Sequence, residues 1–460
     1  MTSDDAAAAV SHPLELILRL CEALAAEGVR YCHWKSTATL DRAQLGEGDL
    51  DLLVDRRCSQ DFLEILGRLG FKAAHGAREL PGVFHAYGLD APSGKLVHIH
   101  AHFALVLGDD MTKNYRLPVE DAYLASTTQQ AVFRVPAPQF ELAVLVIRLV
   151  LKHAAWDATL IGLGPLGAAE RHELEDLTRR VSPAVVHDCV RTHLPFIGES
   201  VWQDCRRALE PAAPPWARVL AARRLEAALA SCGRRPWYVD TPLKLSRRAS
   251  GFLLRRLAPR RRPRLRLDSG GALIAIVGGD DLDRSTTVAA LHAWLARDFE
   301  SVRIRLATAP RAVPAKSAMG TSRPAEAGVR SFLDLVRQVF SARSRHRESL
   351  RARRLASQGA LVICDGFPLP RPCSGGEIAP VRPLEERGGT ALSALARLET
   401  YYRDQIPYPD LLLVLGPQNS DAVEEKEDTD WRNTPVCVLD ADAAQADVLA
   451  DAKRCVWSGL

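Results

Sequence analysis

The spacing of apolar residues predicts a helix and two strands near the start of the chain. From Pro13 to Glu27 apolar side chains recur every three or four residues and Gly28 follows, so we expect a helix that ends at this glycine. Residues 29–34 and 49–55 are expected to form strands. In the second strand acidic and apolar residues alternate, which leaves one face buried and one face polar.

A helix and a hairpin are expected next. Ser59 is a suitable cap for a helix with a periodic apolar stripe that Gly70 closes. Residues 84–89 and 95–103 alternate as strands around the turn sequence DAPSG, so we expect them to pair as a hairpin.

The second half of the chain changes its pattern twice. Residues 138–254 show helical periodicity broken by prolines. An Arg-rich and Pro-rich stretch at 247–266 is expected to be a solvated connector, and a contact with anionic lipid or nucleic acid is the alternative. From Ala272 the pattern becomes buried strand, turn and helix, and the strand-like runs 361–364 and 411–415 then alternate with helical segments.

This order predicts an α/β fold with three regions. Residues 1–135 form an α/β domain, 136–267 a helical region with the basic linker, and 268–460 a domain built on a parallel sheet. A chain of 460 residues is long enough for two or three hydrophobic cores, and an apolar fraction of 47% is that of a globular protein.

Charge, cysteine spacing and apolar run length argue against a nucleic-acid-binding, a disulfide-rich secreted or a membrane-spanning protein. The formal charge of +4 does not favour nucleic acid as a partner. None of the 10 cysteines is spaced as C-x-x-C, so we expect reduced thiols. The sequence shows no signal-peptide pattern and no apolar run as long as a membrane span, which predicts a cytoplasmic protein.

The first candidate site consists of Asp49 and Asp51, which project from the same face of one strand. Two adjacent carboxylates repel each other unless a divalent cation neutralises them, and such a cation, Mg²⁺ or Mn²⁺, can bind a nucleoside triphosphate. A solvated strand edge with turn-favouring acids is the alternative. From the repulsion alone we expect that asparagine at either position leaves stability equal or higher.

The segment HWKSTATLDRAQLGEGDLDLLVD resembles the polymerase-beta-type nucleotidyltransferase superfamily. It is most similar to a bacterial group, often found with polysaccharide genes, in which HWKS, GDLDLLV and LVHIHAHF precede a kinase-like domain. Over residues 13–125 the resemblance implies that Asp49 and Asp51 bind metal and that Lys35 and Ser36 form the turn that holds phosphate. Lys35 stands where the superfamily has glycine, and the third carboxylate of the superfamily is missing.

Three histidines replace that carboxylate on the later strand. His98, His100 and His102 share one face of it, and we expect this face to lie beside the two aspartates. His98 or His100 could complete the metal site and shift its preference toward manganese or zinc. They could equally donate hydrogen bonds to phosphate or act as a general base.

Residues 270–460 resemble thymidylate kinases, with the sequence GGDDLDRST at the position of the phosphate-binding loop. Gly278, Asp280, Ser285 and Thr286 match the family, and Asp365 keeps a second acidic position of the family.

Other family positions have changed. Arg284 replaces the lysine and Asp283 a glycine, Asp281 stands where relatives have glycine, and Gly366 replaces an arginine. The expected lid, residues 420–430, is acidic with only Lys426 positive. An added carboxylate about 5 Å from a triphosphate costs about 3 kcal/mol per unit pair, so ATP is expected to bind weakly.

These patterns favour a metal-dependent nucleotidyl or phosphoryl transferase that carries an inactive kinase-like domain. Its ligands would be ATP or another nucleoside triphosphate and an unknown small-molecule or glycan-precursor acceptor. Two alternatives remain: an active thymidylate or nucleoside monophosphate kinase with an atypical loop, and a non-enzymatic protein that binds nucleotide or a partner.

Overall fold

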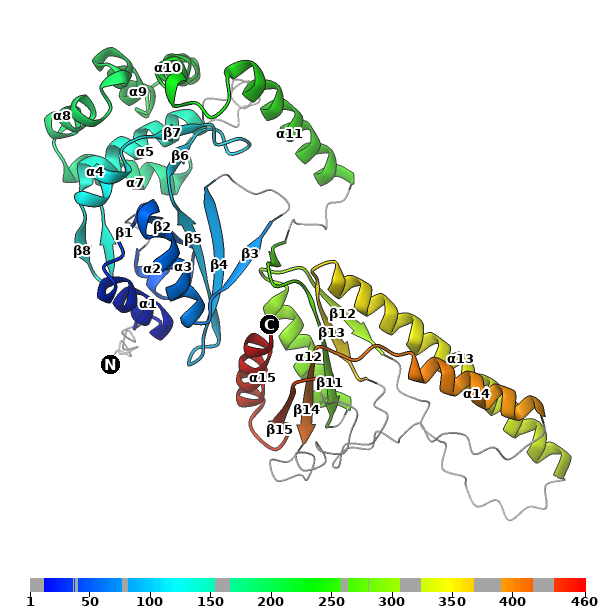
Figure 1. The fold of residues 1–460 in the computed structure, drawn as a ribbon. Coiled ribbons are helices and arrows are strands. Elements are labelled where there is room, and N and C mark those ends of the chain that lie inside the picture. Colours follow the sequence, from blue (N-terminus) through cyan, green and yellow to red (C-terminus); the bar gives the residue numbers. More distant parts are fainter. Residues whose placement is uncertain are drawn as a thin grey trace, which may run out of the picture. The chain divides into compact units, whose positions relative to one another are not determined.

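The computed structural model describes residues 12–35, 37, 40–76, 82–153, 166–257, 264–279, 281–306, 324–367, 390–416 and 434–460. The chain divides into two compact units, residues 1–263 and 264–460. It combines helices with one mixed and one parallel sheet, as the sequence predicted (Figure 1).

The mixed sheet of the first unit carries its strands in the order β1-β2-β5-β4-β3. Strands β2 and β5 are parallel, and the other neighbouring pairs are antiparallel. The predicted hairpin is confirmed as β4 and β5. The strand bounds are β1 Tyr31–His33, β2 Leu50–Val54, β3 Lys72–His75, β4 Val83–Asp90 and β5 Lys95–His102.

Three helices accompany this sheet, namely α1 (Glu15–Ala26), α2 (Leu40–Gln44) and α3 (Ser59–Arg68). The apolar faces of α1 and α3 and one face of the sheet form a shared core. This explains why apolar residues recur every three to four positions in the helices and at every second position in the strands. Ser59 is not the helix cap that the sequence predicted. Instead, Asp55 accepts a hydrogen bond from the backbone N–H of Arg57 and begins a 3-10 turn, η2 (Arg56–Cys58), ahead of α3.

Short strands lead from β5 to the helical region. They form the pairs β6 (Leu105–Leu107) with β7 (Tyr115–Leu117) and β8 (Thr128–Gln130) with β9 (Phe133–Val135), and α4 (Glu120–Ala125) lies between the pairs. The helices that follow are α5 (Pro138–Lys152), α7 (Ala168–Arg180), α8 (Pro183–His193), α9 (Glu199–Ala208), α10 (Pro215–Ala228) and α11 (Trp237–Leu257), with 3-10 turns η3 (Pro195–Ile197) and η4 (Ala230–Cys232).

The helical region and the mixed sheet share a hydrophobic core. Cys32, Trp34 and Leu53 of the sheet region pack in one cluster with buried residues of α5 and α8–α10. Part of the expected connector is ordered, since α11 extends to Leu257. Within it, Arg247 donates to the carbonyl oxygen of Met111 at 2.6 Å, and Arg248 forms an ion pair with Asp109. Residues 258–263 of the connector lie outside the described part of the chain.

The second unit is built on a five-stranded sheet in the order β12-β13-β11-β14-β15, and all neighbours are parallel. The strands of this sheet are β11 (Ala272–Gly278), β12 (Ser301–Arg305), β13 (Leu361–Asp365), β14 (Leu411–Gly416) and β15 (Val436–Asp440). The short strand β10 (Arg266–Leu267) is not part of it. The helices are α12 (Asp281–Leu295), α13 (Pro324–Ser357), α14 (Thr390–Asp404) and α15 (Gln445–Gly459).

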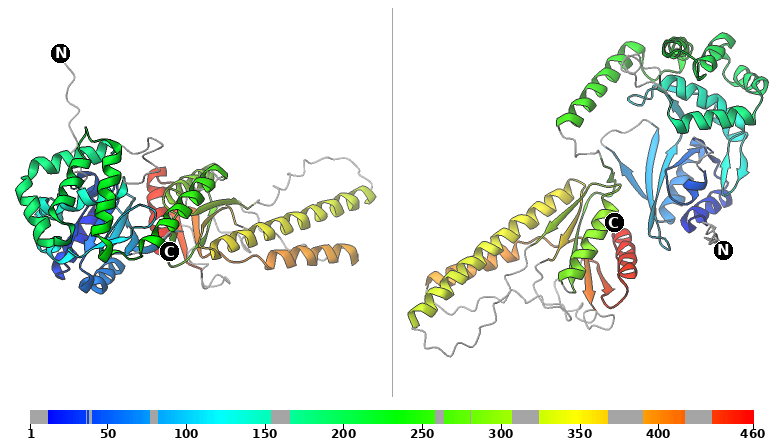
Figure 2. Two further views of the ribbon diagram at one scale, coloured as in Figure 1. Left: turned by 90° about the horizontal axis from the view of Figure 1, so that it is seen from above. Right: turned by 180° about the vertical axis from the view of Figure 1, so that it is seen from behind.

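Fully buried strands explain the continuous apolar runs that the sequence shows here. Helices α13 and α14 pack against each other and extend beyond the sheet as a long pair (Figures 1 and 2). The structure corrects the expectation for the cysteines, because Cys437 of β15 and Cys455 of α15 form a disulfide with a Cα–Cα distance of 6.4 Å. Among the described helices, none has the length and apolar character to cross a membrane.

Candidate active site

Three neighbouring strands of the first unit place a row of polar side chains on one face of the sheet. In the strand register Asp51 of β2 lies opposite His100 of β5, and His100 lies opposite His85 of β4. His98 pairs with Tyr87 in the same way. Because side chains alternate along a strand, Leu50, Ile99 and their alternate neighbours enter the core behind this face. Alternation along each strand and the pairing of the strands together bring these polar side chains onto one face.

Asp51 is the most enclosed acid of this face. It forms an ion pair with Lys35, and its Oδ1 lies 3.5 Å from Nδ1 of His100 and 3.4 Å from Nε2 of His102. Burial by itself would raise the pKa of this carboxyl, but the hydrogen bonds from the two histidines and the charge of Lys35 outweigh it. The pKa of Asp51 is thus held well below its usual range, and the group is ionised.

Asp49 precedes β2 by one residue and is half exposed. Its Oδ1 accepts a hydrogen bond of 2.8 Å from Nδ1 of His98, and its Oδ2 lies 3.7 Å from Nε2 of His100. The hydrogen bond from His98 lowers the pKa of Asp49. His100 therefore stands between the two carboxylates, and the predicted proximity of histidines and aspartates is confirmed.

Lys35 reaches this face from the turn after β1. A backbone hydrogen bond of 3.1 Å from Trp34 to the carbonyl oxygen of Asp51 fixes the turn against β2. The Lys35 ammonium lies 3.4 Å from Nε2 of His102 and 4.9 Å from the centre of the Trp34 ring. Burial lowers the pKa of Lys35, while Asp51 opposes the shift. Ser36, predicted to hold phosphate beside Lys35, lies outside the described residues.

The helical region also contributes to this turn, which the sequence analysis missed. Thr37 donates to the carboxylate of Glu141 twice, from its backbone N–H at 3.0 Å and from its hydroxyl at 3.2 Å. Arg180 of α7 donates to the same hydroxyl at 3.3 Å. Glu141 is buried, which raises its pKa. A single acid within the apolar run of α5 was the available signal, because a buried carboxylate needs a partner.

His85 and Tyr87 of β4 are further residues that the sequence analysis did not single out. Nδ1 of His85 lies 3.3 Å from Nε2 of His98, and the Tyr87 ring stacks on His98 at a centroid distance of 4.1 Å. Burial and the neighbouring His100 and His98 lower the pKa of His85 to about 4. The hairpin register was the available signal, since it places both residues opposite the predicted histidine face.

Asp49, Asp51 and His100 are the residues of this face that could hold a divalent cation. Lys35, His100 and His102 all contact Oδ1 of Asp51, and both carboxylates converge on His100. Oxygen ligands of this kind suit Mg²⁺ or Mn²⁺, and an imidazole at the same place suits the softer of the two.

The second candidate site lies where β11 and β13 of the parallel sheet end. The carboxylate of Asp365 accepts from Nε of Arg284 at 3.3 Å, from Arg303 at 2.7 Å and from the hydroxyl of Ser285 at 2.8 Å. Arg284 also donates to the carbonyl oxygen of Gly278 at 3.3 Å. Burial would raise the pKa of Asp365, but these hydrogen bonds and the Arg284 charge lower it. Asp365 is thus ionised and paired with two guanidinium groups.

The structure brings together only some of the residues predicted for this site. Helix α12 already begins at Asp281, so Arg284, Ser285 and Thr286 are helical residues rather than loop residues. The exposed Thr286 donates to the carbonyl oxygen of Leu282 one turn earlier. Asp280 and the predicted lid, residues 420–430, lie outside the described residues.

A cavity of about 260 Å³ lies beside the start of α12. The residues that line it come from the ends of β11 and β14, from α12 and from the β15–α15 segment, and they are Gly279, Asp283, Thr287, Leu415, Ala441, Ala443, Gln445 and Val448. Gly279 has a φ of +60°, a conformation that favours glycine. The cavity adjoins the predicted phosphate-binding segment, but Arg284 and Asp365 are not part of its lining.

Comparison with known proteins identifies no family for this chain. No protein-family model matches it, and neither does any curated protein. Among solved structures, the solution structure of the antibiotic-resistance factor ANT(2'')-Ia matches 40% of this chain and 94% of its own, with 14% sequence identity and a TM-score of 0.24. A likeness this low carries no argument about function, which therefore depends on the site itself.

Proposed function

We propose that the first unit transfers a nucleotidyl or related phosphoryl group from a nucleoside triphosphate to a hydroxyl acceptor. The arrangement of Asp49 and Asp51 around His100 carries this proposal, since two ionised carboxylates next to one imidazole could hold Mg²⁺ or Mn²⁺. The resemblance of the HWKS and GDLDLLV segments to nucleotidyltransferases supports the same reaction.

Each residue of the site has a chemical task in this proposal. When bound, the cation neutralises the carboxylates and polarises the phosphoryl group under attack. Lys35 then exchanges its contact with Asp51 for a phosphate oxygen, to which it offers a compact positive charge. His98 or His100 accepts the proton of the acceptor hydroxyl, whose oxygen forms the new bond to phosphorus while pyrophosphate leaves with the electrons of the broken P–O bond.

The acceptor that we propose is a small molecule or a glycan precursor of surface-polysaccharide or nucleotide-sugar metabolism. The association of similar sequences with polysaccharide genes is the support for this class. It is an argument from resemblance, and the residues of the site do not select among hydroxyl acceptors.

For the second unit we propose a kinase-like module that does not turn over. A phosphoryl transferase of this type needs a carboxylate that holds magnesium beside the phosphates. Here Arg284, Arg303 and Ser285 already occupy the carboxylate of Asp365. Two guanidinium groups therefore neutralise the charge that a cation would need.

Incubation of the purified chain with each labelled nucleoside triphosphate, Mg²⁺ or Mn²⁺ and a panel of hydroxyl acceptors tests both proposals. Metal-dependent release of pyrophosphate is expected, and it should disappear in Asp49→Asn and Asp51→Asn. Asp61→Asn, which changes an exposed acid of α3, is the matched control and should retain the reaction. Release of ADP instead would support the active kinase, and release of neither product the non-enzymatic alternative.

A further inference from the structure

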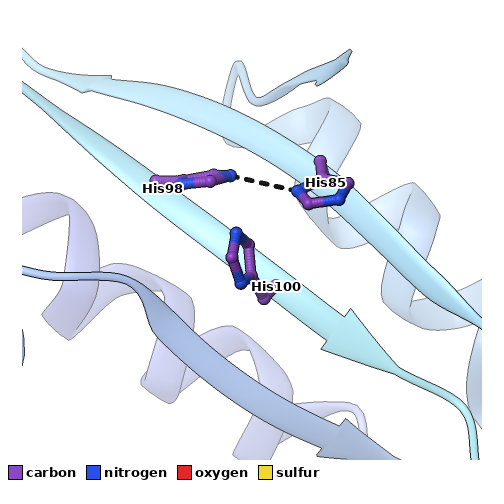
Figure 3. A group of neighbouring side chains, drawn as sticks. All are labelled: His85, His98 and His100. Carbon is purple, nitrogen blue, oxygen red and sulfur yellow. Dashed lines mark hydrogen bonds between the residues drawn. The ribbon is translucent and has the colours of Figure 1, made fainter. Parts of the chain in front are cut away.

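Three imidazoles gather on strands β4 and β5 at the edge of the candidate active site. Each of His85, His98 and His100 offers one ring nitrogen, and these three nitrogens lie within 4.8 Å of one another. Figure 3 shows the rings of His98 and His100 on one strand and the ring of His85 on the neighbouring strand, where it points toward His98. From this geometry we infer that the three histidines bind a late transition-metal ion of the Zn²⁺ class.

The distance between His85 and His98 agrees with tetrahedral coordination. Imidazole nitrogens lie 2.0–2.1 Å from zinc, so two ligands of a tetrahedron stand about 3.4 Å apart. Nδ1 of His85 and Nε2 of His98 are 3.3 Å apart. The third nitrogen, from His100, lies within 4.8 Å of the other two. His85 and His100 are paired across β4 and β5, so the sheet fixes the backbone positions of both ligands.

The surroundings of His98 are those of a metal ligand. Its Nε2 faces His85, and its opposite nitrogen, Nδ1, is bonded to Asp49 at 2.8 Å. A carboxylate behind a metal-binding histidine fixes the tautomer and the ring orientation and makes the ligand more basic. Tyr87 stacks on the other side of the same ring, nearly parallel at 11°. The ring is thus oriented before any metal arrives.

The donor set selects the kind of metal. Three neutral nitrogen ligands suit zinc, nickel, copper and cobalt, whereas magnesium and calcium prefer oxygen ligands. This site shares His100 with the carboxylate pair of the proposed function and adjoins Asp49, but its own donors are three nitrogens rather than carboxylate oxygens. Three protein ligands leave a fourth position for water or for an oxygen of a bound molecule. The inference does not depend on nucleotidyl transfer, because metal binding is expected without any substrate.

Zinc binding by the full-length chain tests this inference. After removal of metals with a chelator, the protein is titrated with Zn²⁺ in competition with a chelating dye, under reducing conditions. We expect His85→Ala to bind one zinc ion fewer than the unaltered chain. The matched control, His172→Ala, removes an exposed histidine of α7 and should bind zinc like the unaltered chain. The Asp49→Asn variant is expected to bind this zinc about 10–100-fold more weakly, because the carboxylate of Asp49 orients the ring of His98.

X-ray absorption of the zinc-loaded, unaltered chain gives a test that needs no variant. Scattering from three imidazoles in the zinc shell is the expected result. A shell of sulfur ligands would overturn the inference, and so would equal zinc stoichiometry in His85→Ala, His172→Ala and the unaltered chain. In that case the 3.3 Å contact would be a hydrogen bond between two imidazoles.

Discussion

Replacing Asp51 by asparagine is expected to destabilise the first unit, whereas replacing Asp49 is not. The adjacent carboxylates in the sequence suggested that either change relieves repulsion. The structure gives each acid a different environment. The side chain of Asp51 is 17% exposed and pairs with Lys35, which is 27% exposed, but the side chain of Asp49 is 49% exposed.

The magnitude follows from what Asp51→Asn leaves behind. Two unit charges about 4 Å apart attract by about 4 kcal/mol at an effective dielectric of 20 and by about 1 kcal/mol in water. Loss of one partner of a fully buried pair costs about 3–5 kcal/mol, and of an exposed pair about 0–1 kcal/mol. Lys35 and Asp51 lie between these limits, so we expect a loss of about 1–3 kcal/mol. For Asp49→Asn we expect a change within about 0.5 kcal/mol.

Urea unfolding of the full-length chain at neutral pH measures these differences. The lowered pKa of Asp51 means that its contribution is fully present above the unfolded pKa of about 3.9 and is lost only as pH falls through the lower folded pKa. A cycle with Lys35→Met isolates the pair. The double variant should be more stable than the sum of the single changes predicts, by about 0.5–3 kcal/mol, because no partly buried charge is left unpaired.

Two results would refute this reasoning. If Asp51→Asn raised the free energy of unfolding, repulsion between the two carboxylates would outweigh the attraction of Lys35. If the cycle showed no coupling, the ion pair between Lys35 and Asp51 would not contribute to stability. Equal losses in Asp49→Asn and Asp51→Asn would also contradict the difference in burial on which the prediction depends.

Three further predictions concern both units. Burial lowers the pKa of His33 to about 4, so the folded chain keeps this imidazole neutral. Because the unfolded chain binds the proton more readily, the unfolding temperature should fall as pH drops from about 7 to 5, and it should fall less in His33→Leu. Asp365→Asn should cost the second unit about 3 kcal/mol in urea unfolding, since it removes the carboxylate that balances the charge of the buried Arg284. The loss should exceed that of Arg303→Ala, whose side chain is partly exposed. The double change Asp283→Gly with Arg284→Lys should raise the affinity for magnesium-ATP in calorimetric titration, because it removes a carboxylate near the start of α12 and replaces a broad guanidinium by a compact ammonium. Tight binding by the unaltered chain would contradict this.

Local patterns in the sequence were sufficient for most of the elements near the first site. The helix before Gly28, the strand that carries Asp51 and the β4–β5 hairpin are confirmed because each depends on contacts within a few residues or across one turn. Alternation along β5 also predicted that its three histidines would share a face. Period-two and period-four patterns decide such features without any knowledge of the rest of the chain.

Helix starts were predicted less well, because several residues compete for the same role. Asp55 rather than Ser59 begins the turn before α3, since its carboxylate reaches a backbone N–H that Ser59 does not. In the second unit the sequence GGDDLDRST predicts a phosphate-binding loop over residues 278–286, but α12 starts at Asp281. An acid such as Asp283 near the N-terminus of a helix interacts favourably with the helix dipole, which favours an early start.

Only the tertiary structure decided which side chains compensate one another. Lys35 and Asp51 are 16 residues apart, Thr37 and Glu141 are 104 apart, and neither contact follows from a local pattern. Each contact exists because a charged or polar group enclosed by the fold needs a partner, and the fold determines which partner is near. The sequence by itself determined the elements and their polar faces, and the packing of distant segments determined the charges and donors that make those faces a site.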